Sequence, residues 1–223
     1  LRLSSAASDV YKRQILGCGG TILRKVFEGE TVGLLFMTSM IESEGWSKAQ
    51  ISTRIKELSE IQKKLKIDKK NFFELNLPTA KLDTLPLGDI IAKTFKVFKS
   101  FQPDEVFLPH PGDVHSDHRI CFEASIPCTK WFRLNSIKRV YTYETLSETD
   151  VLPNESKLFV PNTFIDISNT LKEKIKLLKT YKSEVQKFPF PRSEKAVKSL
   201  AEYRGSQSGF LAAEAFQLLK SKY

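Results

Sequence analysis

The sequence predicts an α/β protein in which a mostly parallel sheet is wound with helices on both faces. Two observations lead to this fold class. Apolar segments of strand length alternate with amphipathic segments of helix length, which is typical of parallel, doubly wound sheets. Hydrophobic residues make up 41% and charged residues 27% of the 223 residues, the balance of a globular protein. A chain of this length can bury one core, so we expect a single domain.

The elements of the first half follow from periodicity and from capping residues. A short helix begins near Ile15 and ends near Gly29, a residue suited to a C-cap. The β-rich segment 31–38 is a predicted strand. In 51–65, apolar residues recur at spacings of three and four, which indicates an amphipathic helix. The other elements are a strand over 72–77, a helix over 87–101, a strand over 106–108 and a helix over 117–125.

The second half continues the alternation. Segment 138–143 is a predicted strand, and strand signals recur over 158–166. Apolar residues at helical spacing mark a helix around 171–178. Two further helices are expected over 193–203 and 210–220.

Charge and cysteine content narrow the function classes. The formal net charge is +9, but the lysines are spread along predicted helices, so we interpret them as solvated helix faces rather than a nucleic-acid surface. Cys18, Cys121 and Cys128 are too few and too scattered for a disulfide framework, which favours a reducing cytoplasm. No apolar run approaches the roughly 18 residues of a membrane helix, so no stable membrane insertion is expected.

The polar chemistry is concentrated in one segment. All three histidines lie within 110–118, directly after an apolar strand and at the start of a helix. In open α/β sheets, ligands bind at that end of a strand. His115 and His118 are three residues apart, so both can face one pocket. Imidazole and carboxylate groups are zinc ligands, but a catalytic zinc needs about three, so a second segment must contribute.

A glycine-rich segment, ILGCGGT over 15–21, precedes this one. It does not complete a phosphate-binding loop, because Ile22 stands where the last glycine of that pattern is needed. We expect its glycines to allow close packing of the first helix, and Cys18 to be a small buried residue.

Segments 15–21 (ILGCGGT) and 113–119 (DVHSDHR), in this order, resemble the PIG-L/LmbE-like zinc N-deacetylase family. The similarity continues through 143–149, 159–167, 204–205 and 213–216. It implies a Rossmann-like three-layer sandwich and hydrolysis of the N-acetyl group of an N-acetylglucosamine-type sugar or glycoconjugate. The implied cofactor is Zn²⁺ or another divalent metal, with His118 as a ligand.

The resemblance also assigns roles to residues. His115 matches the histidine that stabilises the oxyanion and protonates the leaving amine, and Asp117 is expected to orient it. Asp113 of the same motif is placed with the substrate-binding residues, as are Tyr143 and Glu144 at a strand end. Arg54 resembles an arginine that approaches the substrate. As an alternative, Arg54 and Glu57 form an exposed ion pair of little energetic weight.

The N-terminus departs from the family pattern. The family has a His-Pro-Asp-Asp-Glu motif immediately before the segment that matches Ile15, whereas this chain has VYKRQ over 10–14. Two metal ligands and the general base are thereby absent, and Lys12 and Arg13 replace two aspartates. Segment 1–14 also resembles a translated sequencing adapter; a genuine disordered tail is the alternative. We expect 1–14 to be non-native, 15–223 to be one deacetylase domain, and the first strand to be missing or distorted.

The expected function is therefore metal-dependent sugar N-deacetylation by the parent protein, with the present chain inactive. The expected partner is a small-molecule sugar or glycoconjugate and not nucleic acid; a homo-oligomer stays open. One alternative is a non-catalytic carbohydrate-binding relative, which predicts sugar binding without metal. A basic nucleic-acid-binding α/β domain is the other, and it predicts steeply salt-dependent association.

Overall fold

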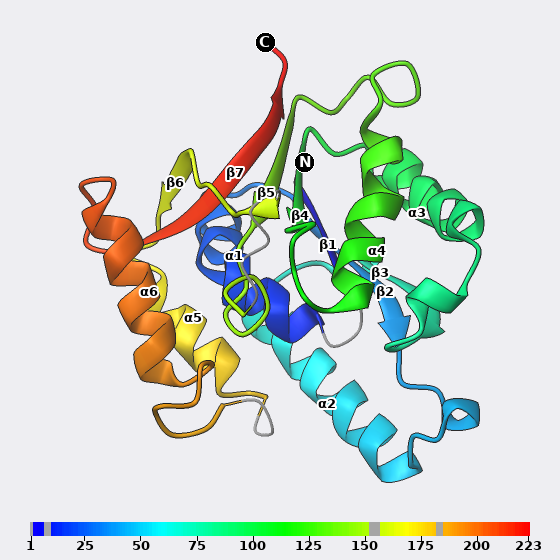
Figure 1. The fold of residues 1–223 in the computed structure, drawn as a ribbon, viewed down its shortest axis with the longest axis horizontal. Helices are drawn as coiled ribbons and strands as arrows, with labels where there is room; N and C mark the ends of the chain where they lie inside the picture. Colours follow the sequence, from blue (N-terminus) through cyan, green and yellow to red (C-terminus); the bar gives the residue numbers. More distant parts are fainter. Residues whose placement is uncertain (1, 7–9, 152–156, 182–184) are drawn as a thin grey trace.

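The computed structural model describes residues 2–6, 10–151, 157–181 and 185–223. Seven strands form one sheet in the order β3-β2-β1-β4-β5-β7-β6 (Figure 1). The strands are β1 (Arg2–Ala6), β2 (Val32–Ser39), β3 (Phe72–Pro78), β4 (Glu105–Pro109), β5 (Arg139–Tyr143), β6 (Thr163–Asp166) and β7 (Ala213–Ser221). The α-helices are α1 (Val10–Phe27), α2 (Lys48–Leu65), α3 (Leu87–Phe101), α4 (Ser116–Ser125), α5 (Leu171–Leu178) and α6 (Glu194–Ser206). Short 3-10 helices are η1 (Glu42–Glu44), η2 (Lys69–Asn71), η3 (Leu82–Thr84) and η4 (Ile126–Thr129).

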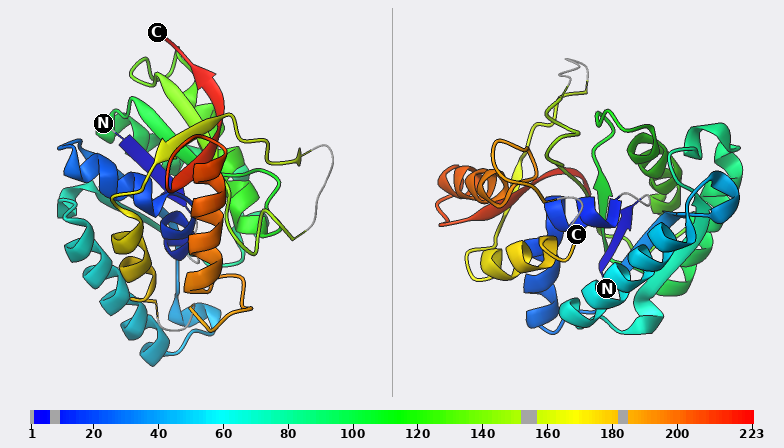
Figure 2. Two further views of the ribbon diagram at one scale, coloured as in Figure 1. Left: turned by 90° about the vertical axis from the view of Figure 1, so that its left-hand side faces the viewer. Right: turned by 90° about the horizontal axis from the view of Figure 1, so that it is seen from below.

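Helices cover both faces of the sheet, which confirms the three-layer α/β prediction (Figures 1 and 2). Strand β2 shows how one strand serves both layers. Leu34 and Phe36 point into a core shared with α1, α2 and α5. Leu35 and Met37 point into a second core shared with α3 and α4. Because successive side chains of a strand face opposite ways, a continuously apolar strand such as β2 is buried on both faces.

The sheet is mostly parallel. Strands β3, β2, β1, β4 and β5 run in the same direction, while β7 is antiparallel to β5 and β6 is antiparallel to β7. The strand order reverses between β1 and β4. In open α/β sheets, this reversal opens a crevice at the carboxyl ends of the two strands, where ligands bind.

The expectation that the first strand is missing or distorted is wrong. Strand β1 pairs in parallel with β2 along Arg2–Ala6 and with β4 along 2–4. The ladder uses backbone groups, and segment 2–6 contains neither glycine nor proline to interrupt it. Arg2 anchors the start of the strand through its guanidinium, which lies 2.7 Å from Glu30, 2.5 Å from Asp104 and 2.9 Å from Glu105.

The helix expected over 210–220 is also wrong, because this segment forms β7. It pairs with β5 on one side and β6 on the other. Its alanine, glutamate and leucine residues have good intrinsic helix propensity, but that preference is small beside the hydrogen bonds of two ladders. The other predicted helices and strands are confirmed, with shifts at their ends, and α1 begins earlier than expected.

Helix α1 consists of two helical pieces joined at Cys18, whose backbone is not helical (φ −139°, ψ 18°). The Glu214 carboxylate accepts hydrogen bonds from the amides of Gly20 at 2.8 Å and Thr21 at 2.7 Å, and so caps the second piece. The ammonium of Lys174 lies 2.6 Å from the same carboxylate. The joint brings the glycine-rich segment against the sheet.

The glycines of this segment are required by close packing, as predicted. A Cβ on Gly17 would lie 2.3 Å from the ring of Tyr143 and 2.8 Å from the carbonyl of Glu144. One on Gly20 would lie 2.8 Å from the side chain of Ile167. Cys18 is buried between these contacts, with 1% of its surface exposed. Among the described helices, none is long and apolar enough to cross a membrane.

Candidate active site

Three segments meet at the carboxyl ends of β1, β4 and β5. Helix α1 follows β1 and brings Arg13, the segment 110–118 follows β4, and the segment 144–150 follows β5. Two hydrogen bonds join the latter two segments: the amide of Val114 donates to the carbonyl of Glu148 at 3.2 Å, and the Thr149 hydroxyl donates to Asp113 at 2.5 Å. The predicted histidine segment therefore lies in the crevice that the strand order creates.

His115 is the N-cap of α4. Its Nδ1 accepts a hydrogen bond from the amide of Asp117 at 3.2 Å, which puts the proton of the neutral ring on Nε2. Its ring stacks on that of His118, with centroids 5.2 Å apart and planes inclined by 26°. The two histidines thus face one site, as their spacing predicts.

His118 is completely buried and is held by a carboxylate. Its Nδ1 lies 2.7 Å from Oδ2 of Asp113, whose side chain is also fully buried. Burial raises the pKa of Asp113 to about 7, against the hydrogen bond from Thr149 and the charges of His110 and Arg13. A carboxylate on Nδ1 fixes the orientation of the ring and directs Nε2 toward any group that the site binds. Asp113 is therefore placed to orient His118.

Asp117 connects α4 to the loop before η3. Its carboxylate accepts hydrogen bonds from the amides of Ala80 at 2.7 Å and Leu82 at 3.1 Å. Burial raises its pKa, and the hydrogen bonds from the amides of Leu82 and Ala80 act in the opposite direction. Both oxygens thus hold backbone groups, and the expected orienting of His115 stays a prediction.

Helix α1 contributes Arg13 to the site. Its guanidinium forms an ion pair with the carboxylate of Glu148, and both side chains are buried. The positive charge of Arg13 also acts on Asp113 and on the hydroxyl of Tyr143. A permanent cation therefore lies within reach of the carboxylates around His118.

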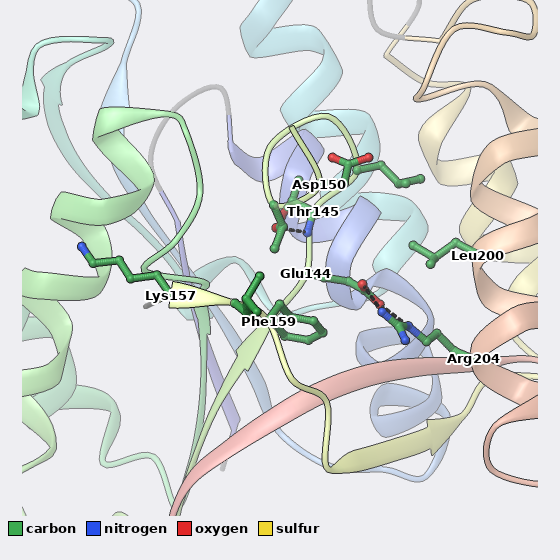
Figure 3. A pocket seen from close by; sticks show the side chains of 10 residues that line it. Glu144, Thr145, Asp150, Lys157, Phe159, Leu200 and Arg204 are labelled. Carbon is green, nitrogen blue, oxygen red and sulfur yellow. Dashed lines mark hydrogen bonds and ion pairs between the residues drawn. The ribbon is translucent and has the colours of Figure 1, made fainter. Parts of the chain in front are cut away.

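A cavity of about 380 Å³ lies between the segment that follows β5 and helix α6 (Figure 3). Its polar wall includes Glu144 and Arg204, whose carboxylate and guanidinium are joined at 2.7 and 2.6 Å. Its apolar wall includes Phe159 and Leu200. The cavity adjoins the histidine site through Thr149, which lines the cavity and donates to Asp113.

His110 closes the same region. Its Nε2 lies 2.8 Å from the carbonyl oxygen of Lys157, and its ring packs edge-on against Phe159 with centroids 5.3 Å apart. Gly112 permits this approach, because a Cβ there would lie 2.4 Å from the Lys157 carbonyl. His110 therefore contacts two residues of the cavity wall, Lys157 and Phe159.

Tyr143 and Arg54, two of the predicted substrate-binding residues, do not line the cavity that Glu144 lines. Tyr143 is fully buried against Gly17, and burial raises its pKa well above the ordinary value. Arg54 is 5% exposed and lies 3.4 Å from Glu57, with its guanidinium 5.6 Å from the ring centroid of Tyr181. The alternative of an exposed Arg54–Glu57 pair is therefore wrong, while a role in substrate binding stays a prediction for both residues.

The side chains at the site do not fit a metal ion. In the part of the chain that the structure describes, no group of three or more His, Cys, Asp and Glu side chains is arranged to hold one. His118 offers one nitrogen ligand, Nε2, but the second buried carboxylate, that of Glu148, is already paired with Arg13, which brings a positive charge to the site. A divalent ion and a guanidinium repel each other at such a site.

Sequence reasoning did not assign the partners across loops. Glu148, Thr149 and Arg204 lie in segments that contribute to the family resemblance, but their contacts depend on which strands are neighbours. Phe159 and Leu200 carry no sequence signal that distinguishes a cavity wall from a core position.

A family model and several solved structures match this chain. The family model for PIG-L, described as GlcNAc-PI de-N-acetylase, matches residues 14–129, just over half of the chain. The match begins at residue 14, the last residue of the segment that departs from the family pattern, and it includes the histidine segment.

Solved structures share the fold over nearly the whole chain. The conserved protein TT1542 from Thermus thermophilus is 25% identical, with a TM-score of 0.76, covering 100% of this chain and 96% of that one. An inhibitor complex of N,N′-diacetylchitobiose deacetylase from Pyrococcus horikoshii is 21% identical, with a TM-score of 0.75, covering 98% and 83%. GalB, the 4-carboxy-2-hydroxymuconate hydratase from Pseudomonas putida, is 16% identical, with a TM-score of 0.69, covering 100% and 96%. The fold therefore accommodates more than one chemistry, and the site must decide between them.

Proposed function

The chain belongs to the PIG-L family, and from this membership we propose that its site is that of a sugar N-deacetylase. The proposed reaction, for the parent protein that carries the missing first motif, is metal-dependent hydrolysis of the N-acetyl group of an N-acetylglucosamine-type sugar or glycoconjugate. The observation that carries the proposal is the pair of stacked histidines, His115 and His118, with Asp113 on His118, at the switch point of the sheet. Imidazole groups held in this way supply the acid–base chemistry that amide hydrolysis needs.

Each predicted residue has a role in this proposal. His115 is the acid that protonates the leaving amine, and its position at the start of α4 is half-buried. In a parent protein that carries the missing first motif, His118 would be a nitrogen ligand for Zn²⁺ or another divalent ion, and Asp113 would orient it. Asp117 holds His115 through the start of α4.

The cavity suits a sugar. Carboxylate and guanidinium groups at Glu144 and Arg204 can hydrogen-bond hydroxyls, while Phe159 and Leu200 provide an apolar wall for the face of a ring. Arg54, Asp113 and Tyr143 complete the proposed substrate-binding set. We propose a small-molecule partner rather than nucleic acid, a cytoplasmic location, and either a monomer or a homo-oligomer.

The proposal includes the N-terminal segment. Residues 1–14 are proposed to be non-native, so that this chain is inactive although residues 15–223 carry a deacetylase domain. Lys12 and Arg13 stand where carboxylates are needed, and the geometry at Arg13 is that of an ion pair rather than of a ligand.

Restoring the missing motif tests the function. The variant carries Val10→His, Tyr11→Pro, Lys12→Asp, Arg13→Asp and Gln14→Glu. Acetate release would be measured with added zinc on N-acetylglucosamine, N,N′-diacetylchitobiose and a nucleotide-linked N-acetylglucosamine. We expect release from at least one of these substrates by the restored variant and none by the original chain.

The control is the same variant with His115→Ala added. It should fold as well as the restored variant and lose about 10²–10⁴-fold in rate, the usual contribution of a positioned acid. Unchanged activity would exclude the role of His115. Saturable sugar binding without acetate release, in the original chain and the restored variant alike, would instead favour the non-catalytic carbohydrate-binding relative.

A further inference from the structure

We infer that Arg13 is the resident cation of this site: its guanidinium pairs with the buried carboxylate of Glu148, so the charges at the site are balanced without a metal ion. The inference concerns this chain's own charges and does not depend on whether a restored variant deacetylates a sugar.

The first step is that two acidic side chains are buried at the switch point of the sheet. Asp113 and Glu148 are 1% and 7% exposed, and they lie on two segments joined by the hydrogen bonds of Thr149 and Val114. Carboxylates in a buried position require a positive partner, because an uncompensated ion there is strongly unfavourable. The Nδ1 atom of His118 is in hydrogen-bond contact with Asp113. The negative charge of Glu148 must therefore be balanced by a residue of another segment.

The second step is the position of Arg13. Its side chain is 4% exposed, and it pairs directly with Glu148. Arginine remains protonated throughout the usual pH range, so this charge is permanent. Helix α1 delivers it to the carboxyl end of β1, the same edge at which β4 and β5 end.

The third step is the consequence for metal ions. A divalent ion at these carboxylates would have to displace the guanidinium, which would then be buried beside a second positive charge. Another buried cation borders α1, Lys174, but it pairs with Glu214 and donates to the carbonyl of Leu16, away from the histidine segment. Lys174 therefore provides a matched comparison for Arg13.

A zinc titration of the metal-free chain, followed by thermal unfolding, tests the inference. We expect the melting temperature of the original chain to be the same with zinc and with a chelator. Arg13→Asp replaces the cation by a carboxylate and should make zinc stabilising, whereas Lys174→Met should leave the chain indifferent to zinc. Stabilisation of the original chain by zinc that His118→Ala abolishes would overturn the inference, as would equal zinc responses of the Arg13→Asp and Lys174→Met variants.

A double-mutant cycle tests the ion pair independently of any metal. Arg13→Met and Glu148→Gln should each lower the melting temperature, by on the order of 10 °C, because each leaves one buried charge without its partner. The double variant should lose less than the sum of the two shifts. Additive shifts would show that Arg13 does not act through Glu148. If one of the variants folds poorly, the zinc titration of the unsubstituted chain still tests the inference.

Discussion

At the scale of single residues, close packing determines where the site lies. Gly17 is in contact with the ring of Tyr143 and with the backbone of Glu144, the residue that begins the polar wall of the cavity. The glycine thus fixes the distance between α1, which carries Arg13, and the end of β5. A side chain at this position would separate two of the three segments that form the site.

Gly17→Ala is therefore expected to destabilise the protein by about 1–3 kcal/mol, the usual cost of an atom forced into a packed core. Gly88→Ala is the control, because a Cβ on this helical glycine would meet no atom within 4 Å. It should leave stability unchanged or raise it by up to about 1 kcal/mol through helix propensity. Urea denaturation of both variants gives the measurement. Equal effects of the two substitutions would contradict the packing argument.

At the scale of elements, the histidine segment depends on contacts between neighbouring loops. Helix α4 begins at the N-cap His115, and the next acidic residue, Asp117, holds the amides of Ala80 and Leu82. This contact joins the loop after β3 to the helix after β4. Strands β3 and β4 are not neighbours in the sheet. The two segments meet because both leave the sheet at the carboxyl ends of its parallel strands.

Asp117→Ala should cost about 2–4 kcal/mol in the free energy of unfolding, because two amides lose a charged acceptor in a largely buried place. Asp83→Ala, an exposed carboxylate of η3, should change stability by less than about 0.5 kcal/mol. The free energy of unfolding of both variants would be measured by chemical denaturation. This measurement does not depend on catalytic activity. An Asp117→Ala variant as stable as the original would leave orientation of His115 as the better account of this residue.

Elements with strong periodicity could be predicted from the sequence, and elements defined by their neighbours could not. Helix α3 was predicted with its observed bounds, because its apolar face repeats over four turns. Strand β7 was predicted as a helix, because its local composition favours helix and its two partner strands lie far away in the chain. For the candidate site, the spacing of His115 and His118 predicts that both rings face one place, and the two rings stack on each other. Glu148 and Arg13 were not identified as partners, since their contact requires the order of β1, β4 and β5.

At the scale of the whole molecule, the sheet separates two cores, and each contains free thiols. Cys18 lies in the core shared with α1, α2 and α5, whereas Cys121 and Cys128 lie in the core shared with α3 and α4. Strands β2, β4 and β5 supply side chains to both. Because these strands belong equally to the two layers, neither layer can lose its packing without exposing the sheet, and we expect one cooperative transition.

The thiols report on this transition. Burial raises the pKa of Cys128 to about 12 and raises that of Cys121 as well, so these groups are protonated in the folded protein at about pH 8 and react slowly with a maleimide. A raised pKa also means that going from about pH 7 to about pH 9 produces little thiolate in the folded state, whereas an exposed cysteine titrates near 8.5. On addition of urea, Cys18 and the Cys121–Cys128 pair should become reactive at one midpoint, determined by mass spectrometry of the labelled peptides. A lower midpoint for Cys18 alone would show that the α1 layer, with Arg13 and the candidate site, opens before the rest of the sheet.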